Sequence, residues 1–109
     1  MTDFIPNAGA CLVTTNAYTG RGPICWAHRE TSKDPADNGW RILSEIDESD
    51  YLSDPANWTI ADFNELCTIE PALIEIWDLP VGTELCLDVA ADGSRQWIDE
   101  ETGAPISRS

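Results

Sequence analysis

The apolar residues of this chain occur in short runs of strand length, and this spacing limits the possible fold more than any other feature. The runs are Ala10–Thr15, Ile24–His28, Trp40–Leu43, Thr83–Val89 and Arg95–Ile98. Side chains alternate between the two faces of a strand, so Trp40 and Ile42 are expected on one face. Ala91–Ser94 is typical of a hairpin turn before the last run. The sequence therefore predicts about five strands.

The apolar period changes in the middle of the chain. Ile60, Phe63 and Leu66 recur at helical spacing. Thr59 is placed as an N-cap, with Asp62 three residues later as in a capping box. This pattern predicts a helix that begins near Ile60.

A second short helix is predicted over Pro71–Trp77, because proline suits the first position of a helix. Its core-facing residues would be Leu73, Ile74 and Trp77. A strand over Leu73–Trp77 is an alternative interpretation of the same residues.

With 109 residues, the chain is expected to form one α+β domain spanning residues 1–109. The predicted architecture is a small, mainly antiparallel sheet of about five strands, with one or two helices on one face. The residues expected to pack between sheet and helix are Trp40, Ile42, Leu85, Leu87, Phe63 and Leu66. Cys11, Cys25, Cys67 and Cys86 are expected to be free, buried thiols.

Gly39 and Arg41 are expected to have structural roles. Gly39 follows Asn38 at a predicted tight turn, where a positive φ favours glycine. Arg41 alternates with the inward Trp40 and should reach a nearby acid, in a surface ion pair worth about 0–1 kcal/mol.

Acidic charge is distributed unevenly along the chain. Twenty Asp and Glu oppose six Lys and Arg, which gives a net charge of −14. Residues 42–94 carry thirteen acids and no Lys, Arg or His. This charge opposes binding to nucleic acid or to an anionic membrane, so we expect neither partner. A basic protein partner fits the charge, although solubility alone would explain it equally well.

The sequence carries no recognisable catalytic, metal or cofactor motif. Its one histidine, His28, lies three residues after Cys25, and in a strand these side chains point to opposite faces. The cysteine spacing does not match a zinc site, and there is no glycine-rich phosphate loop. We therefore expect a protein that is not an enzyme and has no cofactor. Met1–Phe4 does not begin a secretory signal, and a cytoplasmic location is expected.

The densest polar cluster is the candidate partner-binding site. Its residues are Glu45, Asp47, Glu48, Asp50, Tyr51 and Asp54. Aromatic residues beside carboxylates are typical anchors for a basic partner. A solvated loop that only carries charge is the simpler interpretation. A different class of function is a small-ligand or metal-binding regulatory module with a pocket ringed by Trp26, Trp40 and Tyr51.

Several ordered motifs resemble one known family. They include Trp26-Ala-His-Arg-Glu30, Asp37-Asn-Gly-Trp-Arg41 and Tyr51-Leu-Ser-Asp-Pro-Ala-Asn57. Over about residues 10–85 the chain resembles the bacterial immunity-protein-33-like family, also catalogued as a domain of unknown function. The resemblance implies a small cytosolic domain that neutralises a toxin of an interbacterial competition system, and hence a toxin as the basic partner.

Overall fold

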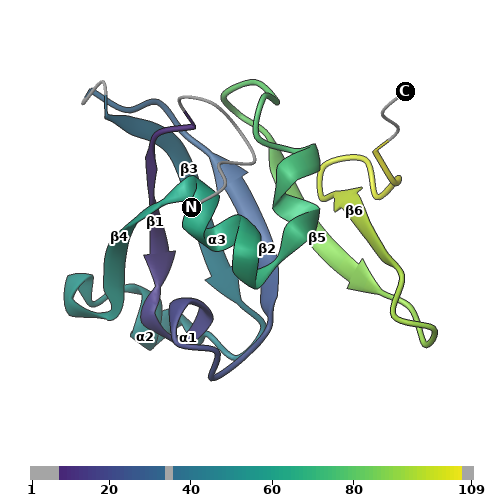
Figure 1. Ribbon diagram of the computed structural model, residues 1–109, viewed down its shortest axis with the longest axis horizontal. Coiled ribbons are helices and arrows are strands. Elements are labelled where there is room, and N and C mark those ends of the chain that lie inside the picture. Colours follow the sequence, from purple (N-terminus) through teal and green to yellow (C-terminus); the bar gives the residue numbers. More distant parts are fainter. Residues whose placement is uncertain (1–7, 34–35, 107–109) are drawn as a thin grey trace.

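The computed structural model describes residues 8–33 and 36–106, which form a six-stranded mixed sheet with short helices (Figure 1). The strands are β1 (Ala10–Thr14), β2 (Ile24–Arg29), β3 (Asp37–Ser44), β4 (Trp58–Asp62), β5 (Glu84–Val89) and β6 (Arg95–Asp99). Their order across the sheet is β4-β1-β3-β2-β5-β6. β1 and β3 are parallel, and the other neighbours are antiparallel. The α+β class is as predicted, with one strand more than the roughly five expected.

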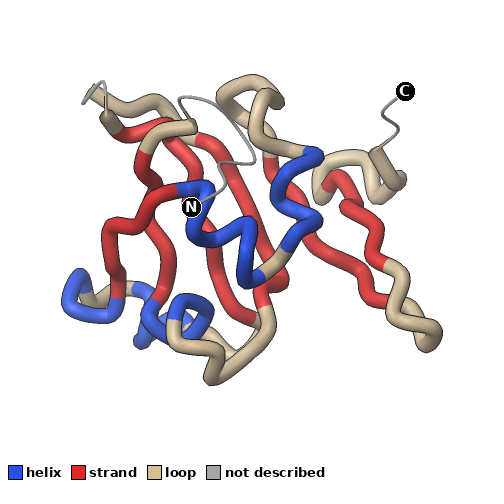
Figure 2. Tube along the Cα trace, viewed as in Figure 1, coloured by secondary structure: helices blue, strands red, loops and turns tan. Residues whose placement is uncertain are grey.

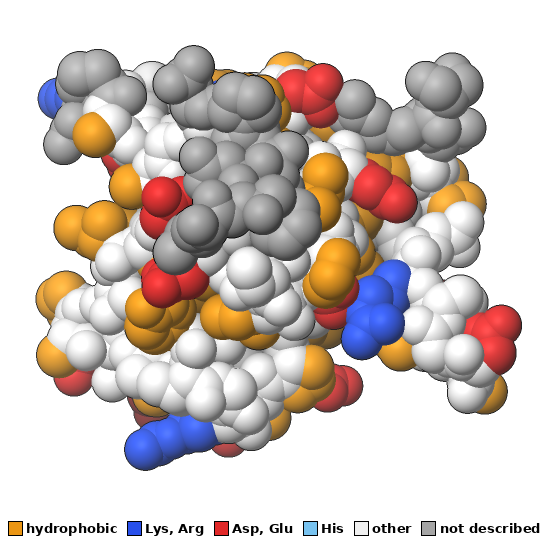
Figure 3. All heavy atoms as spheres, in the orientation of Figure 1, with side chains coloured by type: hydrophobic (Ala, Val, Ile, Leu, Met, Phe, Trp, Pro, Cys, Tyr) orange, Lys and Arg blue, Asp and Glu red, His pale blue; other side chains and the backbone are white. Residues whose placement is uncertain are grey.

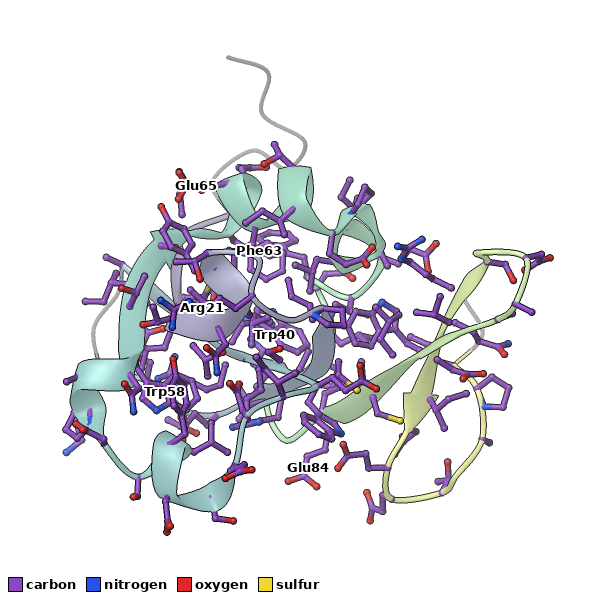
Figure 4. All side chains as sticks on the ribbon, turned by 90° about the horizontal axis from the view of Figure 1, so that it is seen from below. Arg21, Trp40, Trp58, Phe63, Glu65 and Glu84 are labelled. Atoms are coloured by element: carbon purple, nitrogen blue, oxygen red, sulfur yellow. The ribbon has the colours of Figure 1, made fainter. Side chains whose placement is uncertain are left out.

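Short helices connect the strands (Figure 2), and they lie on both sides of the sheet rather than on one face as predicted (Figure 4). They are α1 (Thr15–Tyr18), α2 (Ser49–Leu52), η1 (Pro55–Asn57), α3 (Phe63–Ile69) and η2 (Pro71–Glu75), where η denotes a 3₁₀ helix. In Figure 4, α3 lies on one side of the sheet, and α2 and η1 lie toward the other. Within residues 8–33 and 36–106, no helix has the length and apolar character that crossing a membrane requires.

The predicted start of the central helix was wrong. Residues 58–62 form β4, which pairs antiparallel with β1, so that Thr59 lies opposite Val13 in the sheet rather than capping a helix. α3 begins at Phe63, and its N-cap is Asp62, whose carboxylate accepts a hydrogen bond of 2.9 Å from the Asn64 N–H. Residues before an N-cap are free to be extended, and the β-branched Thr59 and Ile60 suit a strand.

The predicted second helix is present as η2, but one of its core residues was misassigned. Leu73 and Ile76 are fully buried, whereas Ile74 is 37% exposed. A 3₁₀ helix has three residues per turn, so residues three apart share a face. The core side of η2 therefore follows a spacing of three, which the α-helical assumption did not anticipate.

The core lies between the sheet and the α3–η2 layer, as the sequence predicted. Trp40, Ile42, Leu85 and Leu87 are buried with Phe63 and Leu66 in one apolar cluster. The rings of Trp40 and Phe63 are 6.3 Å apart between centroids. The Trp40 indole N–H donates to the Trp77 carbonyl at 3.0 Å, so this large side chain is buried with its polar atom satisfied.

The four cysteines are free, as expected, but only two are fully buried. Cys11 and Cys67 lie in the core, and burial raises the pKa of Cys11 to about 12 and that of Cys67 to about 11. Cys25 and Cys86 are half-buried, because they belong to the strands β2 and β5 away from the core face. The thiols of Cys11 and Cys67 are therefore protonated near neutral pH.

Gly39 has the positive φ that was predicted, at 88°, but it lies inside β3 and not in a turn. A Cβ at this position would clash with the backbone oxygen of Glu30. Glycine therefore allows β3 and the end of β2 to approach closely, and Glu30 N–H donates to Gly39 O at 2.9 Å.

Replacing Phe63 by Ala tests the helix placement. Phe63 is fully buried, so Phe63→Ala should lower the free energy of unfolding by about 3–5 kcal/mol. Ile69→Ala in the same helix is the matched control, because Ile69 is 43% exposed and should cost much less. Urea denaturation followed by tryptophan fluorescence measures both. Equal losses would contradict the observed orientation of α3.

Candidate partner-binding surface

The face of the sheet opposite α3 carries a second set of side chains. In β3, Arg41 and Leu43 alternate with the inward Trp40 and Ile42 and therefore lie on this open face. Figure 4 shows Phe63, at the start of α3, on one side of the sheet and Glu84 on the other. Alternation along the strands thus separates a core face from an open face.

The open face contains a hollow of about 640 Å³ between the sheet and the α2–η1 segment. Its apolar lining is Leu12, Leu43, Leu52, Pro55, Trp58 and Ile60, and its polar lining includes His28, Glu30 and Arg41. The Trp58 indole N–H donates to the Leu52 carbonyl at 2.9 Å, which ties the α2–η1 segment to β4. A hollow that is mainly apolar with a few polar groups has the composition of a binding site.

Arg41 is the centre of an ion-pair network on the open face. It is 8% exposed, and its guanidinium donates two hydrogen bonds to Asp37, at 2.9 and 3.0 Å, and one to Glu30. The predicted pairing with nearby acids is confirmed, but the expected surface position is wrong. Arg41 belongs to β3, which lies inside the sheet between β1 and β2, and only 8% of the residue is exposed.

The Asp37 carboxylate is held in its charged form. The hydrogen bonds from Arg41 lower the pKa of Asp37 far below its usual range, with further help from the Gly39 N–H and the Ser32 hydroxyl. The pKa of Arg41 is raised by the same pairing. The Asp37 carboxylate and the Arg41 guanidinium therefore both stay charged over the whole physiological pH range.

Asp47 anchors the acidic segment of residues 45–54 and has a structural role. Its two carboxylate oxygens accept hydrogen bonds from the Asn16 side chain at 2.8 Å and from the Ser44 N–H at 2.7 Å. Asp54 similarly caps η1 by accepting from the Ala56 N–H at 2.9 Å. These two predicted site residues shape the segment.

Three other predicted site residues point into solvent. Glu45, Glu48 and Asp50 are exposed, and their carboxylates form no hydrogen bond or ion pair within residues 8–33 and 36–106. Tyr51 is half-buried in α2, and its carbonyl accepts from the Asn57 side chain at 2.9 Å. The six predicted residues therefore lie on one segment beside the hollow, with different local roles.

Little positive charge offsets these acids. Of the four arginines in the described part of the chain, Arg29 donates to backbone carbonyls, Arg41 pairs with Asp37 and Glu30, and Arg95 pairs with Glu70. Arg21 is exposed. On the α3 side of the molecule, seen in Figure 3, basic side chains occur at a few separate places among scattered acids. Among the described residues, no Lys or Arg forms an ion pair with Glu45, Glu48 or Asp50.

The predicted ring of Trp26, Trp40 and Tyr51 does not form. Trp40 is fully buried in the core, whereas Trp26 alternates with the core residue Ala27 and lies on the opposite face of the sheet. Among the residues that the structure describes, no three His, Cys, Asp or Glu side chains gather closely enough to hold a metal ion. Ile60 was missed as a surface residue, because it was counted in the helical pattern with Phe63 and Leu66, whereas it lies in β4 and is exposed.

The open sheet face, its apolar hollow and the neighbouring acidic segment together form the candidate binding surface. Comparison with known families identifies the chain: residues 11–99 match the model described as immunity protein Imm33 domain, and the chain belongs to this family. The resemblance predicted from the ordered motifs is thereby confirmed, and it extends beyond residue 85. No curated protein and no solved structure matches the chain.

Removing the arginine of the network should destabilise the fold. Arg41→Ala leaves the partly buried Asp37 without its partner, and we expect a loss of about 3 kcal/mol in the free energy of unfolding. Arg21→Ala is the matched control, since Arg21 is exposed and should change stability by less than about 0.5 kcal/mol. Thermal denaturation followed by circular dichroism measures both; a loss near 1 kcal/mol for Arg41→Ala would mean that the pair behaves as a surface pair.

The lowered pKa of Asp37 predicts a specific dependence of stability on pH. A depressed folded-state pKa contributes stability that is present above the unfolded pKa of about 3.8 and is lost as pH falls toward the folded pKa. Wild-type stability should therefore drop as pH falls below about 5, and Asp37→Asn should drop less steeply over the same range. Urea titrations at several pH values measure the two slopes. Parallel slopes would show that Asp37 is not the titrating group.

Proposed function

We propose that this chain is an immunity protein that neutralises a bacterial toxin by binding it, without catalysis, in the cytoplasm of the cell that makes it. Membership of the Imm33 family is the observation that supports the immunity role. The acidic segment of residues 45–54 is the proposed contact surface, and the proposed toxin is basic. The supporting observation is that Glu45, Glu48 and Asp50 are exposed and unpaired on a segment that Asp47 holds in place.

The rigid attachment of the segment supports this proposal. A partner that binds a preorganised surface loses less conformational entropy than one that must order a loop. Asp47, Asp54 and the Trp58 indole each fix part of the backbone of this segment. Exposed carboxylates at the rim of an interface act mainly on the rate of association, because they steer a basic partner over long distances.

Neutralising the exposed acids should slow association. In the variant Glu45→Gln, Glu48→Gln and Asp50→Asn, the association rate with the cognate toxin should fall, and its dependence on salt should become flatter. Surface plasmon resonance at two ionic strengths measures both effects. Asp47 is left intact, because its carboxylate stabilises the fold.

A charge-matched variant separates a local effect from one of net charge. Glu75→Gln, Asp88→Asn and Glu101→Gln remove the same charge at exposed sites on η2, on β5 and after β6, toward the sheet edge that lies opposite β4. This control should keep more of the association rate. An equal loss of association rate in both variants would show that segment 45–54 is only a solvated surface. Absence of any toxin binding by the wild type would refute the proposed function.

Tyr51 is expected to act on dissociation. It is half-buried at the centre of the segment, so Tyr51→Ala should increase the dissociation rate and cost about 2 kcal/mol of binding free energy. Tyr51→Phe keeps the ring and is the matched variant, and it should bind nearly as well as the wild type. Unchanged dissociation in Tyr51→Ala would exclude Tyr51 as an anchor.

A further inference from the structure

The two edges of the sheet differ in how they are covered. At the β6 edge, Ile98 forms a β-bridge with Pro105, and the Ile106 N–H donates to the Trp97 carbonyl at 3.0 Å. β4 forms the other edge, and within residues 8–33 and 36–106 no strand lies beyond it (Figure 1). β4 therefore presents an uncovered strand edge.

The backbone N–H and carbonyl of Ile60 point away from β1, toward this uncovered edge. The Phe63 N–H donates to the Gly9 carbonyl at 3.0 Å, which continues the pairing of β4 with β1. Opposed residues in an antiparallel pair alternate between hydrogen-bonded and non-hydrogen-bonded positions, so Ala61 and Thr59 bond to β1 and Ile60 does not. Consistently, the Trp58 N–H donates away from β1, to the Pro55 carbonyl.

The Ile60 side chain is equally open. It is 77% exposed, the highest value among the exposed large apolar residues of the described chain. It borders the hollow of about 640 Å³ and two smaller ones of about 260 and 290 Å³. A strand added at this edge would place one side chain directly opposite Ile60 on the same face, with Trp58 as its diagonal neighbour on β4 and Leu12 on the inner side of Ile60.

The charges around this edge select a basic occupant. Asp62 is exposed at the end of β4, and Glu30 and Asp37 line the adjoining hollows. Arg41 pairs with both of these acids, and its single positive charge offsets only one of their two negative charges. A second copy of the chain would bring another net charge of −14 to the same edge, and this repulsion opposes self-pairing.

We propose that β4 receives an extended segment of a basic partner protein, which adds antiparallel to it as a seventh strand. The segment pairs through the Ile60 N–H and carbonyl, sets an apolar side chain opposite Ile60, and sets Lys or Arg opposite Asp62. Such strand addition derives affinity from backbone hydrogen bonds and specificity from alternate side chains. The proposal uses residues outside segment 45–54 and holds whether or not the partner is a toxin.

The probe is the synthetic peptide acetyl-Thr-Lys-Thr-Ile-Thr-Lys-Thr-amide, in which Ile and both Lys share one face of a strand. It is titrated to millimolar concentration into the ¹⁵N-labelled chain and followed by NMR. The amide signals of Ile60 and Asp62 should shift, and hydrogen exchange of the Ile60 amide should slow about tenfold when about nine-tenths of the chain is bound. Absence of shifts in β4, or equal shifts with Glu in place of both Lys, would overturn the proposal.

Backbone methylation of the peptide tests the strand pairing without changing the protein. An N-methyl group on the central Ile removes the donor that faces β4 and should weaken binding by more than about tenfold. The same group on a neighbouring Thr faces away and should have a small effect. Equal binding of the two methylated peptides would overturn the proposal.

Variants of the chain provide a second test. Ile60→Pro removes only an outward N–H, which an edge strand tolerates, and should abolish peptide binding, whereas Ile60→Val should bind normally. Asp62→Asn keeps a residue suited to cap α3 and should weaken binding roughly two- to fivefold. Sedimentation of the wild type tests whether a second copy of the chain pairs at β4 instead. A wild-type dimer that becomes a monomer in Ile60→Pro would show that the occupant of this edge is a second copy and would overturn the proposal of a basic partner.

Discussion

The burial of Trp40 is the interaction on which the rest of the structure depends. β3 lies between β1 and β2, and Trp40 is fully buried against Phe63 with its indole N–H bonded to the Trp77 carbonyl. Because side chains alternate along a strand, packing Trp40 under α3 places Arg41 on the opposite face. Arg41 cannot remain there unpaired, and Asp37 and Glu30 neutralise it.

The open face of the sheet follows from this arrangement. α3 and η2 cover the core side, so the α2–η1 segment is left to cover part of the other side, where it forms the wall of a hollow. The acidic segment of residues 45–54, which overlaps α2, carries Glu45, Glu48 and Asp50. Apolar surface and unpaired negative charge therefore lie next to each other, which is a combination suited to a basic protein with an apolar anchor.

Local patterns predicted the elements whose partners lie close in sequence or whose face is set by periodicity. The hairpin of β5 and β6, the inward Trp40 and Ile42, and the packing of Phe63 all agree with the structure. β4 was missed because a strand of five residues is stabilised by its partner, and that partner, β1, lies more than forty residues earlier. Asp47 was assigned to binding because one of its two partners, Asn16, lies 31 residues earlier in the chain.

The sequence by itself determined the α+β class, the main core residues, the family and the excess of acid in the second half of the chain, because periodicity, composition and ordered motifs are local properties. Only the tertiary structure decided which acids are engaged, which sheet edge is uncovered and which face is open. Backbone groups of a strand need another strand, and a buried charge needs an opposite charge. Which residues meet those needs depends on contacts between distant segments, so neighbouring residues do not encode the answer.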